Sequence, residues 1–443
     1  MKFYHQLFYL PLSNEMKKLM TLFLVMIIFG CDDSFENTYR YSKIITQSKT
    51  YPVYFDASEI NKIEVKSDVL IIDPFKILAN DKYYFIGDML YGIHVYEKLG
   101  NGVKLISFIE CLFLKDFEIS GNHLYCNNLV DLLVIDVSDP GMPTVLERRE
   151  RHFNRYTSFK EYWNLPYENE KGFIVGSETY ELTGMVTNEQ PDLDFSAYDD
   201  LYKHITTKEI PDNWFSEHPE YDKPYIGMVK METDLIYTYG SYNSWAICNY
   251  HSGYLSVKEH DLWTTPRINF STPYYYSNAF PIRMFFEDNI IFNIGVENNL
   301  MRGYIDCIFY HENFPIRRHL YFQFEPLDIC YVSEFKAFYV LSGTSIWGVF
   351  LGGDEVSGIT RTYVDFEIST DAVEIARVGE QLITVGNELS VYSVTQNELF
   401  KEKIYPEIAG ECFMLEGNNL VVYNNQEILL YDISDLENIQ LIQ

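Results

Sequence analysis

The chain has 443 residues, a formal net charge of −30 at pH 7 and an aromatic content of 16%, including 37 tyrosines. Proteins bind nucleic acid through cationic side chains that neutralise phosphates, so a surface this acidic excludes nucleic acid as a partner. The simplest explanation of the acidity is the solubility of an exposed protein.

The amino-terminal residues have the pattern of an export signal. Two lysines precede an apolar core from Leu19 to Phe29, which is long enough for a signal peptide and short for a membrane span. We therefore expect residues 1–30 to be a signal peptide of the lipoprotein type, whether translation starts at Met1 or at Met16.

The apolar core ends at a sequence that resembles a bacterial lipobox, in which a small residue before a cysteine permits cleavage and the thiol carries a diacylglycerol. Gly30 and Cys31 occupy these positions. Phe29 stands where a small residue is usual, so an ordinary secretory signal with a buried Cys31 is the alternative. A thioether-linked diacylglycerol and an N-acyl chain together exceed the two lipid signals that stable anchoring needs. The resemblance implies that Cys31 anchors the mature chain to a membrane.

Residues 31–38 then form the lipidated end and a short acidic tether. Asp32 and Asp33 directly follow the cysteine, which resembles the surface-export signals of lipoproteins in certain Gram-negative bacteria. This pattern favours a surface-exposed place on the outer membrane and leaves the periplasmic leaflet open. Cleavage removes three lysines and one glutamate, which moves the formal net charge from −30 to −32.

The rest of the chain, residues 39–443, repeats a strand that stops at a turn. The run from Leu132 to Pro140 returns as the run from Leu429 to Asp435, with weaker copies between them at intervals of about 40 residues. Alternating apolar residues suit a strand, and Asp, Ser and Pro suit a turn. Asp139 or Ser138 can accept a hydrogen bond from the N–H two residues further on, while Pro140 blocks further ladder pairing.

Each copy belongs to a unit of four short strands in a meander. The clearest expected strands are residues 83–86, 92–96, 117–119, 123–126, 132–136 and 144–146. Eight units can be counted. The third is weak, and its two clearest strands are Phe173–Gly176 and Thr179–Leu182.

A four-stranded antiparallel unit of this length is typical of an all-β fold, the β-propeller, and the count predicts seven or eight blades. A linear β-solenoid is the competing geometry, but its coils are usually shorter. The segment from Tyr39 to Asp73 precedes the first unit and could add a strand that closes the ring.

The best copy resembles the LVIVD repeat, which is named for a Leu-Val-Ile-Val-Asp core. The run from Leu133 to Pro140 and then Pro143 carry this resemblance, and units that follow a lipid-attachment cysteine are similar to the LVIVD-repeat lipoproteins of Gram-negative cell envelopes. The other copies are degenerate, since Tyr392-Ser393-Val394 lacks the aspartate. Most members of that family have no assigned activity, so the resemblance implies fold and location but no chemistry.

Two insertions interrupt the repeat, at about residues 187–224 and 264–281, and loops on a rigid repeat scaffold often carry binding. The first includes residues 195–202, expected as a short helix capped by Ser196. The rings expected to bind a ligand are Trp214, Phe215, Tyr274, Tyr275 and Tyr276. Three consecutive tyrosines in an extended segment cannot all face one core, and rings with a polar edge suit a wet binding surface. Packing between blades is the alternative for each ring.

Neither a catalytic motif nor a metal site can be read from the chain. Six cysteines follow Cys31, all within expected strands and without a C-x-x-C pair, so they are most simply buried apolar residues, with disulfide pairing left open. The residues that come nearest to a metal-binding cluster are Asp192, Asp194, Asp199 and Asp200. They lack the ligand spacing and central glycine of a calcium loop. No cofactor is expected.

These features predict a lipid-anchored, monomeric propeller at the cell envelope that acts as a non-catalytic binding or scaffolding module for a glycan or protein ligand. The first alternative is a glycan lyase or hydrolase with acidic residues near the central channel, because propeller active sites gather residues from several blades. The second is a structural or assembly component of an outer-membrane complex.

Overall fold

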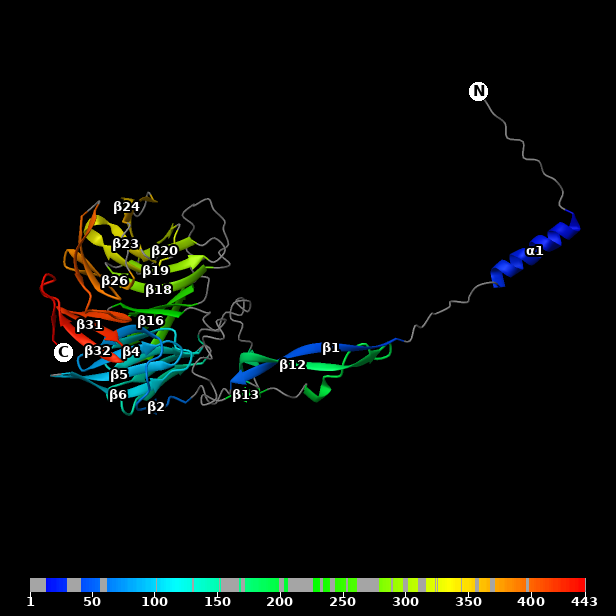
Figure 1. Cartoon of the computed structure of the whole chain (residues 1–443), viewed down its shortest axis with the longest axis horizontal. Helices are drawn as coiled ribbons and strands as arrows, with labels where there is room; N and C mark the ends of the chain where they lie inside the picture. Colours follow the sequence, from blue (N-terminus) through cyan, green and yellow to red (C-terminus); the bar gives the residue numbers. More distant parts are fainter. Residues whose placement is uncertain are drawn as a thin grey trace, which may run out of the picture. The chain divides into compact units, whose positions relative to one another are not determined.

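In a computed structural model of the chain, the described residues form two compact units, one within residues 1–51 and 177–202 and the other within 52–176 and 203–443. The described residues are 13–29, 41–55, 62–100, 102–129, 131–150, 152, 167–168, 172–198, 203–205, 226–231, 234–239, 244–251, 254–260, 279–287, 290–297, 302–309, 316–322, 324, 326–343, 345–354, 358–366, 371–395 and 398–442. The α-helix α1 (Asn14–Phe29) covers the apolar core of the expected signal peptide (Figure 1). In these ranges no helix combines the length and hydropathy needed to cross a bilayer.

The second unit contains seven antiparallel sheets, the blades of a β-propeller (Figure 1). Blade 1 is β3 (Pro74–Ala79), β4 (Tyr83–Asp88), β5 (Gly92–Leu99) and β6 (Gly102–Glu110), with β2 (Val65–Lys66) as a fifth strand beside β6. Blade 2 is β7 (Phe117–Ser120), β8 (His123–Asn128), β9 (Asp131–Asp136) and β10 (Thr144–Arg149). Blade 3 is β14 (Ile226–Met231), β15 (Asp234–Tyr239), β16 (Ser244–His251) and β17 (Tyr254–His260). Blade 4 is β18 (Ala279–Glu287), β19 (Ile290–Glu297), β20 (Arg302–Phe309) and β21 (Ile316–Tyr321).

The last three blades follow without a long interruption. Blade 5 is β22 (Asp328–Val332), β23 (Ala337–Ser342), β24 (Ser345–Asp354) and β25 (Gly358–Phe366), and the 3₁₀ turn η6 (Ser333–Phe335) joins its first two strands. Blade 6 is β26 (Ala372–Val378), β27 (Gln381–Gly386), β28 (Leu389–Val394) and β29 (Leu399–Tyr405). Blade 7 is β30 (Cys412–Glu416), β31 (Asn419–Asn424), β32 (Glu427–Asp432) and β33 (Gln440–Leu441). The prediction of a propeller with seven or eight four-stranded blades is confirmed, and the described strands make seven.

Most successive blades contact one another through their first strands, blades 4 and 5 are joined by the ion pair of Arg283 and Asp328, and β3 of blade 1 contacts β30 of blade 7, which closes the ring. Both faces of a second strand are therefore buried. In β4, Tyr84 and Ile86 pack into a cluster with Tyr423 of blade 7, whereas Phe85 between them packs with Phe117 of blade 2. Period-2 alternation thus assigns neighbouring residues of one strand to different blade interfaces.

The expected turn after the repeated strand forms as predicted. Strand β9 ends at Asp136, and Asp139 Oδ1 accepts a hydrogen bond from the N–H of Gly141 at 3.1 Å. Asp136 Oδ1 also accepts one from the N–H of Ser138 at 2.8 Å. In blade 7, Asp432 accepts the same bond from Ser434 at 2.9 Å. The aspartate of the repeat is therefore a turn-forming residue in both copies.

The same turns connect each blade to the one before it. The carbonyl of Pro140 accepts a hydrogen bond from the Ser107 hydroxyl of blade 1 at 2.8 Å. Leu436, which replaces that proline in blade 7, accepts one from the Tyr405 hydroxyl of blade 6 at 2.8 Å. Because the contact uses a main-chain carbonyl, it survives the loss of the proline.

An eighth sheet has the strand order β11-β12-β1-β13, formed by β11 (Tyr167–Glu168), β12 (Gly172–Thr187), β1 (Ser42–Phe55) and β13 (Lys203–Ile205). In the first compact unit β1 and β12 run antiparallel, since the Thr46 and Thr183 hydroxyls pair at 2.9 Å and those of Thr50 and Thr179 pair at 2.9 Å. We call this two-stranded part the arm.

The arm corrects two predictions. Residues 173–176 and 179–182, expected as two strands of a third blade, belong to one continuous strand, β12, whose neighbours in the sheet are β11 and β1. The strand expected to close the ring, β1, belongs to the eighth sheet instead, where it pairs with β12 and β13. Among the described residues before blade 1, only those of β2 pair with a strand of a blade, namely β6.

A third correction concerns the expected helix at 195–202. The described part is a 3₁₀ turn, η3 (Ser196–Tyr198), and its cap is Asp194, whose Oδ1 accepts the N–H of Ser196 at 2.8 Å. Ser196 is thus the capped residue. Among the cysteines expected in strands, Cys111 lies in the connection after β6.

Candidate functional site

One face of the propeller collects the long connections. In a four-stranded meander the fourth strand ends on the side where the first strand begins. The chain therefore passes from one blade to the next at the same face of the ring, which we call the insertion face. The chain leaves this face after Arg149 and returns at Ile226, and it leaves again after His260 and returns at Ala279. The two connections that contain the expected insertions therefore both start and finish at the insertion face.

Apolar side chains are exposed on the insertion face, where the first strands of three blades begin. Leu70 and Ile72 precede β3 with exposures of 69% and 50%, and Leu327 and Val373 at the starts of blades 5 and 6 are each 44% exposed. Single exposed apolar residues are ordinary on proteins. Their repeated occurrence at one end of the first strands marks this face as a candidate contact surface.

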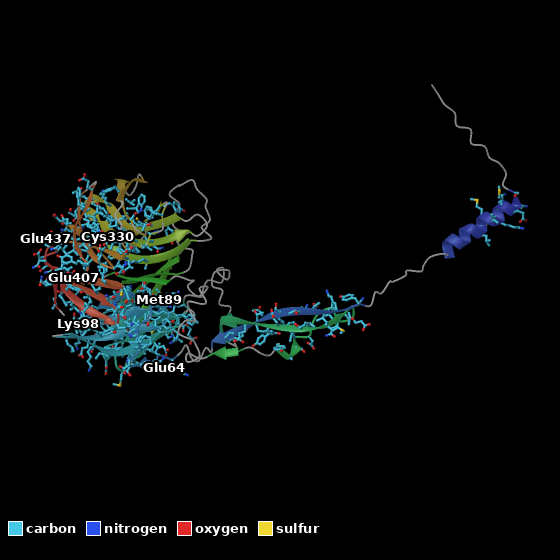
Figure 2. All side chains as sticks on the ribbon, viewed as in Figure 1. Glu64, Met89, Lys98, Cys330, Glu407 and Glu437 are labelled. Atoms are coloured by element: carbon cyan, nitrogen blue, oxygen red, sulfur yellow. The ribbon has the colours of Figure 1, made fainter. Side chains whose placement is uncertain are left out.

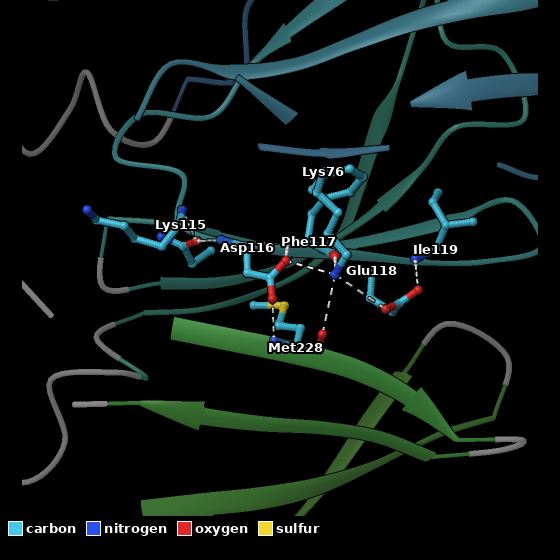
Figure 3. A network of polar contacts seen from close by, with 8 residues as sticks. Lys76, Lys115, Asp116, Phe117, Glu118, Ile119 and Met228 are labelled. Carbon is cyan, nitrogen blue, oxygen red and sulfur yellow. Dashed lines mark hydrogen bonds and ion pairs between the residues drawn. The ribbon is translucent and has the colours of Figure 1, made fainter. Parts of the chain in front are cut away.

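Ionisable side chains at the first strands of neighbouring blades form a network of polar contacts (Figure 3). Lys76 of β3 donates through Nζ to Asp116 Oδ1 at 2.9 Å and to the Phe117 carbonyl at 2.8 Å, and it lies 3.6 Å from Glu118 Oε2. The other oxygen of Asp116 accepts the N–H of Met228 in β14 at 2.6 Å. One lysine and one aspartate thus join blades 1, 2 and 3.

A second charged cluster joins blades 4 to 7. Arg283 of β18 forms an ion pair with Asp328 of β22 and lies 3.6 Å from Glu374 Oε1 of β26. Asp328 Oδ2 accepts the N–H of Ile375 at 2.8 Å, and Glu374 Oε2 accepts the N–H of Phe413 at 2.8 Å. As with Asp116, each carboxylate binds the main chain of the next blade.

Burial shifts the protonation of these groups. It raises the pKa of Asp328, although Arg283 opposes the shift. It also raises the pKa of Glu374, to about 7. For Lys76 burial acts to lower the pKa, but the attraction of Asp116 and Glu118 outweighs it, and the pKa is raised. The lysine therefore stays charged, whereas Glu374 exchanges a proton near neutral pH.

This arrangement is suited to holding blades together. Asp116, Asp328 and Glu374 each give one oxygen to a main-chain N–H across a blade boundary and the other to a cation. A nucleophile or base needs such an oxygen for the substrate. Within the described ranges no three His, Cys, Asp or Glu residues gather as metal ligands would.

None of the residues predicted to bind a ligand or a lipid, and none of the aspartates considered for a metal, belongs to the two charged clusters among the described residues. Trp214, Phe215, Tyr274, Tyr275, Tyr276 and Cys31 are outside the described residues, as are Asp199 and Asp200. Asp192 and Asp194 are described: Asp192 accepts a hydrogen bond from Gln47 Nε2 of β1 at 2.8 Å, and Asp194 accepts one from the N–H of Ser196. Their carboxylates serve the fold of the arm.

The charged clusters were missed by the sequence analysis, although a signal for them exists. Lys76, Arg283 and Glu374 each occupy the third to fifth position of a first strand whose other residues are mostly apolar. A charge at one position of several inner strands indicates a shared polar environment at the centre of a propeller.

No protein-family model and no curated protein matches the chain. Its structure is similar to a candidate 6-phosphogluconolactonase from Bacteroides uniformis ATCC 8492, with 12% identity, a TM-score of 0.40 and coverage of 79% of this chain and 91% of that chain. It is also similar to Sqt1 of Saccharomyces cerevisiae, with 10% identity, a TM-score of 0.42 and coverage of 82% and 96%. A chain of the Mitotic Checkpoint Complex matches with 9% identity, a TM-score of 0.44 and coverage of 86% and 97%. Similarities at this level carry no argument about chemistry.

Proposed function

We propose that the chain is a lipid-anchored β-propeller of the bacterial cell envelope, related to the LVIVD-repeat lipoproteins, that acts as a non-catalytic binding or scaffolding module for a glycan or a protein. The observation that carries the non-catalytic part is the use of the central carboxylates. Asp116, Asp328 and Glu374 bind main-chain N–H groups of neighbouring blades. These contacts make the ring a rigid platform and leave ligand selection to the insertion face.

The cellular address rests on the amino terminus. Helix α1 exposes Leu19, Met20 and Leu22, each by more than half of its surface, as expected of an apolar segment that is made for a membrane and then removed. The tether and Cys31 follow it in sequence. Mass spectrometry of the amino-terminal peptide from cells tests this part. A diacylglycerol on Cys31 that disappears in Cys31→Ala supports it, and an unmodified thiol in wild-type cells overturns it.

Binding is tested by changing one face of the ring at a time. Leu70→Lys with Val373→Lys places two charges on the insertion face, and Met142→Lys is the matched control, because Met142 is 76% exposed in the β9–β10 connection at the opposite face. Capture of glycans from an array and of proteins from solubilised envelopes should fall about tenfold in the first variant and stay unchanged in the control. Equal capture by both variants would contradict the role of this face.

A glycan lyase or hydrolase is the second candidate, and one observation favours it. Glu374 has a pKa raised to about 7, a value that suits a general acid, and Asp328 shares Arg283 with it. Purified protein is incubated with a polysaccharide panel. Turnover that is lost in Glu374→Gln would replace the binding proposal with the enzymatic one.

A further inference from the structure

Two buried thiols touch at the boundary between blades 1 and 2. Cys111 lies in the connection that follows β6, and Cys126 lies in β8. Their Sγ atoms are 3.7 Å apart, and both residues are fully buried in the cluster that also contains Phe85 and Leu133. Since a disulfide has an S–S distance of about 2.05 Å, small side-chain movements would bring the two sulfurs to bonding distance.

The contact sets this pair apart from the other described cysteines. Cys307, Cys330 and Cys412 belong to three different core clusters, none of which contains a second cysteine. Only between blades 1 and 2, among the described clusters, do two cysteines share one core. The spacing of the cysteines along the sequence leaves their pairing open. The fold, in contrast, places Cys111 and Cys126 next to each other.

We propose that Cys111 and Cys126 form an intramolecular disulfide when the chain meets a thiol–disulfide oxidant such as glutathione disulfide. One cysteine thiolate attacks the oxidant, giving a mixed disulfide and one reduced glutathione. The second thiolate then displaces the other glutathione. Two S–H bonds are lost, one S–S bond forms, and the two electrons and two protons leave on the two glutathione molecules.

The position of the pair determines when the bond forms. The hydrogen bond with Cys111, followed by burial, raises the pKa of the Cys126 thiol well above its usual value. The reactive thiolate is therefore scarce in the folded ring, and the oxidant cannot reach either sulfur. The bond forms while blades 1 and 2 are still folding, and the finished core then protects it from reductants.

This inference goes beyond the proposed function and does not depend on it, because the sulfur contact is a property of the ring. Export would supply the oxidising environment in which such bonds persist. The bond would fix the connection between the first two blades, since Cys111 lies between β6 and β7 and Cys126 lies in the next strand of blade 2.

The test refolds the purified full-length chain from denaturant in a buffer of reduced and oxidised glutathione. Remaining thiols are alkylated under denaturing conditions, and peptides are mapped by mass spectrometry. The expected result is a peptide that links Cys111 to Cys126, with a mass about 2 Da below the sum of the two reduced peptides. The same experiment in a Cys31→Ser background should give the same link, which separates this proposal from lipid attachment.

The variants decide between a specific bond and random oxidation. Cys126→Ser should remove the link and lower the urea midpoint of the oxidised protein to that of the reduced protein, and Cys111→Ser should do the same. Cys412→Ser, which removes another buried thiol, should retain the link. Complete alkylation of both cysteines in wild type, or links spread over other cysteines, would overturn the proposal.

Discussion

The side-chain amide of Gln426 hydrogen-bonds both main-chain groups of Ile71, although 355 positions separate the two residues. The Ile71 N–H donates to Oε1 at 3.0 Å, and Nε2 donates to the Ile71 carbonyl at 2.7 Å. Asn425 and Gln426 form a two-residue turn with φ values of 48° and 70°. A left-handed φ favours Asn or Gly, so Gln426 has its position because its side chain joins blade 7 to blade 1.

A second contact supports the same closure. Glu416 of blade 7 accepts a hydrogen bond from the Tyr84 hydroxyl at 2.9 Å and pairs with Lys98 of blade 1. Lys98 is labelled in Figure 2. The Lys98 ammonium also lies 4.4 Å from the centre of the Tyr84 ring, which adds a cation–π attraction. Side chains thus join blade 7 to blade 1, and among the described strands none is exchanged between these two blades.

Gln426→Ala should lower the free energy of unfolding by about 1–3 kcal/mol, because the part-buried Ile71 N–H and carbonyl lose their partners. Urea unfolding followed by tryptophan fluorescence measures the change. Gln440→Ala removes an amide that binds only Asn438 nearby and should change stability by less than about 0.5 kcal/mol. Equal losses in the two variants would show that Gln426 does not close the ring.

Lys76→Met should destabilise the ring by about 3–5 kcal/mol, because it leaves the buried carboxylate of Asp116 without its cation. The comparison is Lys66→Met. Lys66 pairs with Glu110 at 2.6 Å but is 37% exposed, so its loss should cost about 0–1 kcal/mol. Thermal unfolding of both variants measures the difference. A Lys76 variant as stable as the Lys66 variant would show that Lys76 does not hold blades 1, 2 and 3 together.

Glu374 makes stability depend on pH. Burial raises its pKa from 4.5 to about 7, so between these values the folded state binds more protons than the unfolded state. Stability should therefore fall as pH rises from 4.5 to 7, by about 1–3 kcal/mol in total. Glu374→Gln should flatten this slope, whereas Glu402→Gln at an exposed position of β29 should keep it. Urea midpoints at a series of pH values provide the measurement; parallel profiles for wild type and Glu374→Gln would refute the assignment.

Asp136→Ala should lower the melting temperature by removing the acceptor of the Ser138 N–H, while Asp136→Asn should leave it nearly unchanged because an amide oxygen accepts the same bond. The loss should be no more than about 1 kcal/mol, since water competes for an exposed N–H. The Ser138 hydrogen bonds lower the pKa of Asp136, so the difference between wild type and Asp136→Ala should shrink as pH falls below 3.8. Calorimetry at two pH values tests both statements.

The blades were predictable because their signals are local. Alternation defines β8 and β9, and Asp136, Asp139 and Pro140 define the turn after them. The arm was not predictable in this way. A strand-forming segment such as residues 173–182 fits a blade or a two-stranded ribbon equally well, and only the partner strand distinguishes the two. That partner, β1, lies more than 100 residues earlier in the chain.

The charged centre was out of reach of motif analysis for a similar reason. Arg283, Asp328 and Glu374 come from three blades and meet only when the ring closes. The sequence shows each as a charged residue in a mostly apolar strand. Their common role follows from the seven-fold arrangement, which converts equal positions in successive repeats into neighbours.

The pairing of β1 with β12 imposes an order of events on synthesis. The ribosome or the translocation channel releases β1 first, and its partner emerges only after blades 1 and 2 have been completed. Throughout that interval the nascent chain carries a long strand with both edges open, the kind of segment that chaperones recognise and that associates wrongly when left unattended. The leading end of the chain therefore waits longest for its partner, even though each blade can assemble from its own contiguous residues.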